Sequence, residues 1–264
     1  MTGANRFIIE LRPCPEGGRI ARLMIDNRAK LNSLNSALMN EIVTGMERLA
    51  ADPELRLAVL TGAGGRAFVG GADIGEIAAL DHKSARRFIT LVHRCCEAMR
   101  RLPVPVIARI DGWALGAGLE LAAACDLRVA SERSRFGMPE VAIGIPSVVE
   151  AALLPRLVGA GRARRLLLTG EPIDAAEALL WGLVDKVAPA DQIDAAVEEF
   201  ARPILAAGSQ AIRIQKALIL DWEELPVGAA IERGIDAFVA AFDADEPARM
   251  AGGALSRLGT RSRE

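Results

Sequence analysis

The sequence has 264 residues, of which 51% are hydrophobic and 25% are charged, so the chain can bury a large core as one domain or as one domain with an appendage. The formal net charge is −2 and no run of like charges occurs, which argues against binding to nucleic acid or to an anionic membrane surface. The N-terminal stretch has no basic segment followed by an apolar core, and no apolar run reaches the roughly 20 residues of a membrane span. We therefore expect a soluble, cytoplasmic protein.

The four cysteines, Cys14, Cys95, Cys96 and Cys125, do not have the spacing of metal ligands. Cys95 and Cys96 fall in an apolar stripe at helical spacing. Reduced thiols in the core are therefore expected, with neither disulfides nor a metal site.

The N-terminal part of the chain predicts a hairpin followed by a helix and a strand. Runs rich in β-forming residues at 7–11 and 19–25 are separated by a turn of Pro and Gly. Apolar residues then recur at helical spacing up to about Ala50, with an Asn or Ser within 32–35 as the N-cap. A run typical of a buried strand follows at 55–61.

A glycine-rich loop at 62–76 follows this strand. Its letters GAGGRA match a dinucleotide-binding pattern, but the match is weak because the loop continues through Gly70 and Gly71 before a helix can begin. No Gly-Lys-Ser/Thr follows, which argues against a phosphate-binding P-loop. The amides of Gly70, Gly71 and Ala72 could instead face a ligand, and Asp73 is a candidate cap for the next helix.

An amphipathic helix is predicted after Ser84, and both histidines, His82 and His93, lie in it or beside it. No G-x-S-x-G elbow supplies a nucleophile for histidine catalysis. Surface or packing roles are therefore expected for both histidines.

The stretch 110–126, IDGWALGAGLELAAACD, reads as the end of a strand, a tight turn and a helix that starts near Gly116. Small residues at a helix start let a ligand approach the free N–H groups, and the helix dipole favours an oxygen that becomes negative there. Glu120 would lie in the first turn beside them. The alternative is that the glycines only allow close packing and that Glu120 faces solvent.

In the second half of the chain, strands and helices alternate, which predicts a partly parallel sheet. A strand is expected at 125–131, and RFGMPE then leads to Glu140. From Ser147 onward helical patterns dominate, apart from a strand signal at 182–188. We therefore expect an α/β core at 1–190 and a helical region at 191–264.

Paired carboxylates beside an anion-stabilising backbone pocket suit proton transfer next to a thioester. Glu140 lies 20 residues beyond Glu120 in the sequence, a separation that a helix, a strand and a turn can fold back into one site. Glu150 is a third carboxylate. Ser147 and Glu150 have the S-x-x-E form of a capping box, which predicts a helix start, and the alternative is that Glu150 points into the pocket.

Five motifs in order resemble the enoyl-CoA hydratase/isomerase (crotonase) superfamily over nearly the whole chain. They are AKLNSL near Lys30, AFVGGADI from Ala67, DGWALGAGLELAAACD from Asp111, RFGMPEVAIG from Arg135 and LLLTGEPIDAAEALLWGLVDKV from Leu166. The resemblance implies an α/β fold: a crotonase-like core of repeated ββα units with a helical C-terminal trimerisation region. It also implies a homotrimer or homohexamer, an acyl-CoA substrate and no cofactor, since coenzyme A is part of the substrate.

The resemblance assigns roles to particular residues. Backbone N–H groups of Ala72 and Ala117 would form an oxyanion hole for the thioester oxygen, Glu120 would deprotonate the attacking water, and Glu140 would protonate C2. The coenzyme A-binding residues would be Lys30, Ser33, Arg66, Gly70, Gly71, Ala72, Asp73 and Ile74. Residues that could line the acyl pocket are Trp113, Met138 and Glu150.

The sequence also departs from the family pattern. Ala117 stands where many relatives have glycine, Met138 replaces a glutamine, and IPSVVEAALLPRL replaces a glycine-rich turn. Retention of both glutamates favours an enoyl-CoA hydratase. The alternatives are another crotonase-type reaction, namely double-bond isomerisation, thioester hydrolysis or decarboxylation, or a non-catalytic acyl-CoA-binding protein.

Overall fold

The computed structural model describes residues 6–261, apart from the side chains of residue 254 and residues 256–261. The chain divides into two compact units, Met1–Ala201 and Arg202–Glu264. The boundary expected near Ala190, between an α/β core and a helical region, stays a prediction. No helix within the described residues is both long enough and apolar enough to cross a membrane.

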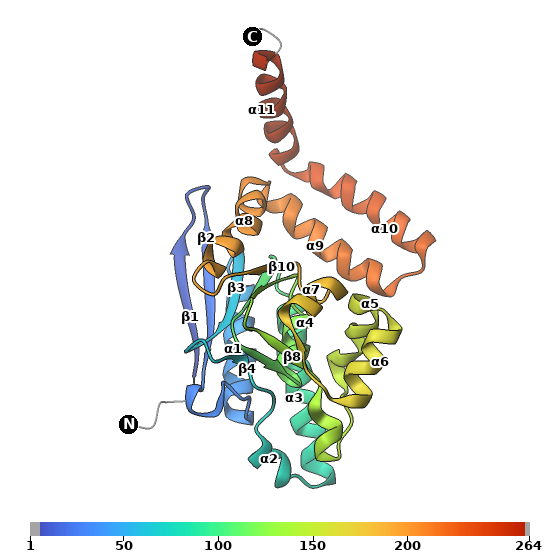
Figure 1. Ribbon diagram of the computed structural model, residues 1–264. Coiled ribbons are helices and arrows are strands. Elements are labelled where there is room, and N and C mark those ends of the chain that lie inside the picture. Colours follow the sequence, from blue (N-terminus) through green and yellow to red (C-terminus); the bar gives the residue numbers. More distant parts are fainter. Residues whose placement is uncertain (1–5, 262–264) are drawn as a thin grey trace. The chain divides into compact units, whose positions relative to one another are not determined.

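The first unit contains a six-stranded sheet that carries most of the core. β1 and β2 form the antiparallel hairpin that the sequence predicts, and every later strand pairs parallel to its neighbour (Figure 1). The strands, in their order across the sheet, are β1 (Arg6–Pro13), β2 (Arg19–Asp26), β3 (Leu55–Gly62), β5 (Val106–Ile110), β7 (Leu127–Ser131) and β10 (Lys186–Ala188).

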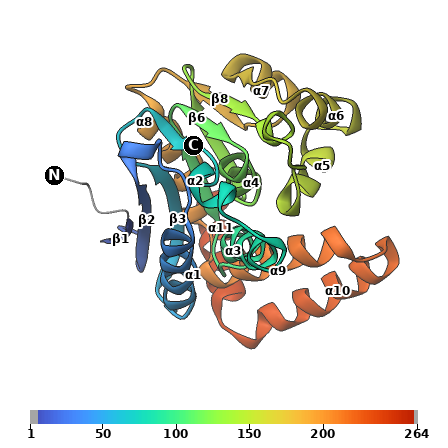
Figure 2. The same cartoon turned by 90° about the horizontal axis from the view of Figure 1, so that it is seen from below.

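A second, smaller sheet lies in the same unit. Its strands, in spatial order, are β4 (Ala67–Val69), β6 (Trp113–Leu115), β8 (Arg135–Gly137) and β9 (Ile173–Asp174). β4, β6 and β8 are parallel neighbours, whereas β9 runs antiparallel to β8. Figure 2 shows β6 and β8 side by side.

The two sheets are built from a repeated strand–strand–helix unit, as the resemblance implies. The first strand of each unit joins the large sheet, the second joins the small sheet, and a short helix follows. These helices are α2 (Ile74–Ala78) after β4, α4 (Ala117–Ala123) after β6 and η2 (Pro139–Ile143) after β8. Because β4, β6 and β8 are parallel, the segments after their carboxyl ends meet at one edge of the small sheet.

The two long helices of the first unit confirm the periodicity seen in the sequence. α1 (Ser36–Ala50) begins after Asn35, whose side chain accepts from the Leu38 N–H. α3 (His82–Arg100) packs against α1 and begins two residues before Ser84. All four cysteines are buried free thiols, as predicted. The remaining helices of this unit are η1 (Arg28–Lys30), η3 (Val149–Leu153), α5 (Leu154–Val158), α6 (Ala160–Thr169) and α7 (Ala175–Trp181), and α8 (Ile193–Ala206) spans the division.

The second unit is helical, as the sequence predicts. It contains α9 (Ser209–Glu224), α10 (Val227–Ala240), η4 (Ala241–Asp243) and α11 (Glu246–Arg261). α9 packs against α10, and the Glu246 carboxylate accepts the free Gln210 and Ala211 N–H groups at the start of α9. α10 and η4 carry exposed apolar side chains, namely Val227, Ile231, Ile235, Phe238, Val239 and Phe242.

Candidate active site

Glu120 is buried in the first turn of α4. Its side chain is only 4% exposed, which rules out the alternative that it faces solvent. The Ala151 N–H donates to Glu120 Oε1 at 3.2 Å. Burial raises the pKa of Glu120 to about 8, the nearby charges of Glu140 and Glu150 add to this increase, and the Ala151 hydrogen bond opposes it. A carboxylate with such a pKa is suited to take up a proton near neutral pH.

Two backbone N–H groups are available near this carboxylate. The Ala117 N–H is at the start of α4, where a helix has no acceptor of its own, and the first α-helical bond runs from the Glu120 N–H to the Gly116 carbonyl. Ala72 pairs with Leu34 through the Gly71 carbonyl and the Asp73 N–H, a pattern that leaves the Ala72 N–H outside the pairing. Both groups can therefore donate to a ligand.

The segments that carry these N–H groups lie against each other. A side chain at Gly118 would overlap the Val69 carbonyl, and a Cβ on Gly71 would be 3.2 Å from the Leu115 carbonyl oxygen. Gly118 therefore allows α4 to pack closely against β4, and this packing also brings the chain around Ala72 toward the start of α4. The glycines can thus serve both close packing and ligand binding.

Glu140 lies against the same helix start. A side chain at Gly116 would overlap Glu140 Oε1, and Gly116 adopts a φ of 51°, which favours glycine. The Gly116 N–H donates to the Gly137 carbonyl at 2.9 Å. This hydrogen bond holds the end of β8, and with it the segment that carries Glu140, against the start of α4. The Ser147 hydroxyl donates to Glu140 Oε2 at 2.8 Å. The structure thus brings Glu120 and Glu140 to the two ends of one turn of α4.

The capping-box prediction for Ser147 and Glu150 is wrong. The 3-10 helix η3 begins after Val148 and has no side-chain cap. Ser147 instead binds Glu140, and Glu150 Oε1 accepts from His93 Nδ1 at 2.8 Å. Glu150 is 5% exposed, and the interpretation in which it points into the acyl pocket stays a prediction.

His93 and Ser147 are site neighbours that no sequence motif marks as functional. The sequence pattern predicts a surface or packing role for His93. It is half exposed, but it contacts Glu150, which lies 57 residues away in the sequence. Ser147 has the residue type of a cap, and its real partner lies seven residues back in the chain.

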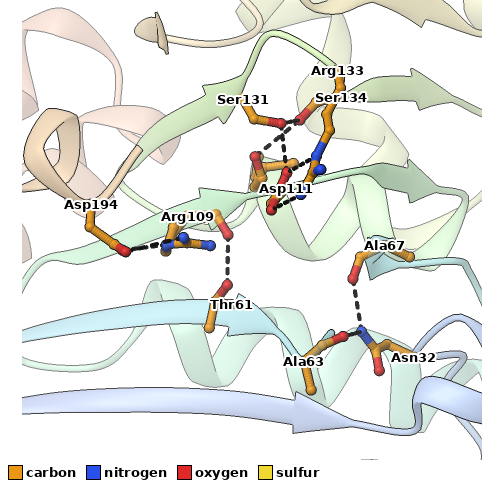
Figure 3. Close-up of polar contacts among 11 residues, drawn as sticks. Asn32, Thr61, Ala63, Ala67, Arg109, Asp111, Ser131, Arg133, Ser134 and Asp194 are labelled. Atoms are coloured by element: carbon orange, nitrogen blue, oxygen red, sulfur yellow. Dashed lines mark hydrogen bonds and ion pairs between the residues drawn. The ribbon is translucent and has the colours of Figure 1, made fainter. Parts of the chain in front are cut away.

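Asn32 also supports the site, although the sequence pattern marks it only as a candidate helix cap. Its buried side-chain amide donates to the Ala63 and Ala67 carbonyls at 2.9 and 2.8 Å (Figure 3). Its side-chain oxygen accepts from the Asn27 N–H. Asn32 thereby holds the start of the glycine-rich loop close to the first residue of β4.

A buried polar cluster fixes the turn that leads into β6. Asp111 accepts from the Ser131 hydroxyl and from two nitrogens of Arg133, and Ser134 donates to the Ile110 carbonyl (Figure 3). Burial acts to raise the pKa of Asp111, but the hydrogen bonds from Arg133 and Ser131 outweigh it and hold the pKa below its usual value. The cluster therefore joins the end of β5 to the end of β7 and to the segment between β7 and β8.

The residues expected to bind coenzyme A line the segments around β4. Asp73 caps α2, as predicted, and pairs with Lys30 at 2.6 Å, and the Lys30 hydrogen bond lowers the pKa of Asp73. Ser33 is buried, whereas Arg66 and Ile74 are exposed. The Gly70 N–H donates to the Leu31 carbonyl at 2.8 Å. Gly70 and Gly71 thus tie the segment to the chain near Lys30.

Of the possible pocket residues, Trp113 and Met138 differ in burial. Trp113 is 38% exposed in β6, and Met138 is fully buried directly before η2. Within residues 6–261, no group of three or more His, Cys, Asp or Glu side chains has the arrangement of a metal site. The described carboxylates and N–H groups can transfer protons and stabilise a negative oxygen.

Comparisons with known proteins identify the family of this chain. Residues 16–249 match the family described as Enoyl-CoA hydratase/isomerase. The chain is 39% identical to a crotonyl-CoA hydratase of Syntrophomonas wolfei over 83% of its length and 85% of the relative. It is 35% identical to a short-chain-enoyl-CoA hydratase of Clostridium acetobutylicum over 92% and 91%. The crystal structure of an enoyl-CoA hydratase from Bacillus anthracis superposes with a TM-score of 0.88 at 29% identity, covering 94% and 96% of the two chains. The chain therefore belongs to the enoyl-CoA hydratase/isomerase family.

Proposed function

We propose that this protein catalyses the reversible addition of water to the double bond of a short-chain 2-enoyl-CoA. The observation that carries the proposal is the placement of two carboxylates, Glu120 and Glu140, at the start of one helix beside two free N–H groups. The names of two relatives, a crotonyl-CoA hydratase and a short-chain-enoyl-CoA hydratase, support a short acyl chain.

In the proposed reaction the thioester oxygen accepts hydrogen bonds from the N–H groups of Ala72 and Ala117. Glu120 removes a proton from water as its oxygen bonds to C3, and the electrons of the double bond move toward the thioester oxygen. The two N–H groups stabilise the resulting enolate, which is the charge that develops in the transition state. Glu140, which must start the turnover carrying a proton, then gives that proton to C2, which completes the addition of one water. Return of the proton from Glu120 to Glu140 restores the two carboxyls for the next turnover.

The two glutamates differ in burial and in hydrogen-bond partners. Glu120 has little contact with solvent, and its raised pKa lets it hold a proton near neutral pH. Glu140 is only partly buried and accepts a hydrogen bond from Ser147, which orients its carboxyl at the helix start. The proposed reaction uses proton transfer by two carboxyl groups and charge stabilisation by backbone N–H groups. It therefore needs no cofactor beyond the coenzyme A of the substrate.

The remaining assignments rest on the family resemblance. Lys30, Ser33 and residues 70–74 would hold the pantetheine, and Arg66, which is exposed, would meet the nucleotide phosphates. Trp113 and Met138 would face the acyl group.

The exposed apolar side chains of α10 would form contacts with other copies, giving a homotrimer or homohexamer. The hydrophobic spacing of Val227, Ile231 and Ile235 places them on one face of the helix. The cytoplasmic location remains a prediction.

The test is an assay with crotonyl-CoA that follows the loss of enoyl absorbance and identifies the product by mass. Hydration predicts a product heavier by one water. Conversion to a 3-enoyl-CoA of unchanged mass would indicate an isomerase, and release of free coenzyme A would indicate a hydrolase. A separate assay with a carboxylated acyl-CoA would reveal a decarboxylase by the loss of carbon dioxide. Binding of coenzyme A esters without turnover of any of these would indicate a binding protein.

A further inference from the structure

Glu150 is a third carboxylate near Glu120, and the proposed reaction does not use it. Its Oε1 accepts a hydrogen bond from His93 at 2.8 Å. Its Oε2 is buried and has no hydrogen-bond partner among the described residues. A buried carboxylate is unfavourable unless hydrogen bonds or opposite charges compensate it, so packing alone does not account for a glutamate at this position.

The backbone around Glu150 joins it directly to Glu120. Ala151, the next residue, donates its N–H to Glu120 Oε1. Val149, the residue before, has a φ of 42°, a left-handed conformation that a β-branched residue rarely adopts. Such strain persists only where surrounding contacts hold it, and the Glu150–His93 hydrogen bond ties this turn to α3.

We propose that Glu150, anchored by His93, is a positioning residue for Glu120: it holds the turn whose N–H binds the Glu120 carboxyl and places a negative charge behind that carboxyl. The inference rests on the proposed function, because it gives Glu150 a role toward the base of that reaction.

Three helices, α4, α3 and α5, pack against the turn that carries Glu150. Glu120 lies on α4, and α5 carries Arg156, which is exposed. The titratable α3 groups near Glu150 are His93, Cys95, Cys96 and Glu97. Burial raises the pKa of the Cys96 thiol well above its usual value, and the charges of Glu150 and Glu120 add to this. Cys96 is therefore a neutral group near both carboxylates. It supplies no positive charge that would offset the repulsion between Glu120 and Glu150.

Glu97 provides a matched control on the other side of His93. Its carboxylate lies 3.7 Å from His93 Nε2, but it also accepts from Arg101 at 2.8 Å and is partly exposed. The Glu97 charge is therefore neutralised and solvated, whereas that of Glu150 is buried. Glu97→Gln and Glu150→Gln each remove one negative charge next to the same histidine.

The experiment measures kcat/KM for crotonyl-CoA against pH in wild type and in these two variants. Glu120 acts as a base only when ionised, so the rate falls as pH falls through its pKa. Because a neighbouring negative charge raises that pKa, Glu150→Gln is expected to move the acid limb to lower pH by roughly half a unit. Glu97→Gln is expected to leave the limb in place. Identical limbs in wild type and Glu150→Gln would overturn the inference.

His93 variants test the anchor without removing a buried group. His93→Ala deletes the donor and is expected to lower kcat about tenfold, whereas His93→Asn keeps an N–H near the Nδ1 position and should restore most of it. Equal losses in both variants would indicate that only bulk matters at this position and would overturn the anchoring role.

A second readout separates this inference from the proposed function. The ionisation of Glu120 can be followed without substrate by infrared titration of its carboxyl, assigned by difference from Glu120→Gln. If wild type hydrates no 2-enoyl-CoA, the proposed function fails, and the titration still decides the inference. A midpoint lower by roughly half a unit in Glu150→Gln supports it, and an unchanged midpoint contradicts it.

Discussion

The two glutamates at the start of α4 belong to the same site but have different surroundings. Glu120 is enclosed by α4, η3 and α3, with one backbone N–H as its hydrogen-bond donor. Glu140 lies on the loop after β8, partly exposed, and is held by a hydroxyl. Two groups of the same chemical type can thus be prepared for opposite proton transfers by burial and by partners. The difference predicts that changes around them have different consequences.

The largest effect is expected from replacing either carboxyl. Glu120→Gln and Glu140→Gln each remove a proton-transfer group but preserve the side-chain shape, so kcat should fall about 10³-fold. Binding of a non-reacting coenzyme A ester, measured by calorimetry, should change little, because the N–H groups of Ala72 and Ala117 remain. A variant that keeps more than a tenth of wild-type kcat would show that its carboxyl does not transfer a proton.

Glu120 should also destabilise the folded protein at high pH. Its pKa rises from an ordinary value of 4.5 to about 8 on folding, so the folded state binds more protons between these values and the free energy of unfolding falls as pH rises through this window. Glu120→Gln should remove that loss, making the variant more stable than wild type by on the order of a few kcal/mol above pH 8.

Urea unfolding at pH 5 and at pH 9 checks this prediction. The stability difference between variant and wild type should grow from the lower to the higher pH. Glu140→Gln is the comparison, because its carboxyl is partly exposed and should give a smaller change. A difference that does not depend on pH would contradict the account of Glu120.

An intermediate effect is expected from Gly116→Ala. A Cβ at this position would overlap Glu140 Oε1, and the φ of 51° is unfavourable for alanine. The Glu140 carboxyl should move, lowering kcat by roughly 10- to 100-fold. Gly161→Ala is the control, since a Cβ there meets no atom within 4 Å. Wild-type kinetics in Gly116→Ala would show that Glu140 does not need its place at the helix start.

The smallest effect is expected from Ser147→Ala. The Ser147 hydroxyl donates to Glu140 Oε2, but the partial exposure of Glu140 allows water to replace that donor. The expected loss in kcat is about threefold, in line with one net hydrogen bond in a solvated setting. A loss as large as that of Glu140→Gln would mean that Ser147 itself takes part in proton transfer.

The sequence predicted the parts of this molecule that depend on local pattern. The hairpin of β1 and β2, the buried stripe of α3 and the Asp73 cap each follow from neighbouring residues. The family motifs also gave Glu120 and Glu140. The capping-box prediction at Ser147 and Glu150 was wrong because it considers only neighbouring residues. The hydrogen-bond partner of Glu150 is His93, which lies 57 residues away in the sequence.

Long-range contacts account for the other missed residues. Asn32 is a residue type that often caps helices, yet its amide donates hydrogen bonds to carbonyls 31 and 35 residues further along the chain. Val149 has no sequence signal for a left-handed backbone, because β-branched residues disfavour it. Such features need the folded chain to be seen.

The most direct test of the central claim, that Glu120 is a buried base for hydration, is the pH dependence of kcat/KM for crotonyl-CoA in the wild-type protein. Because kcat/KM reports groups of the free enzyme, the account predicts activity that falls on the acid side with a midpoint at about 8. An acid limb near 4.5, the ordinary value for a glutamate, would contradict it.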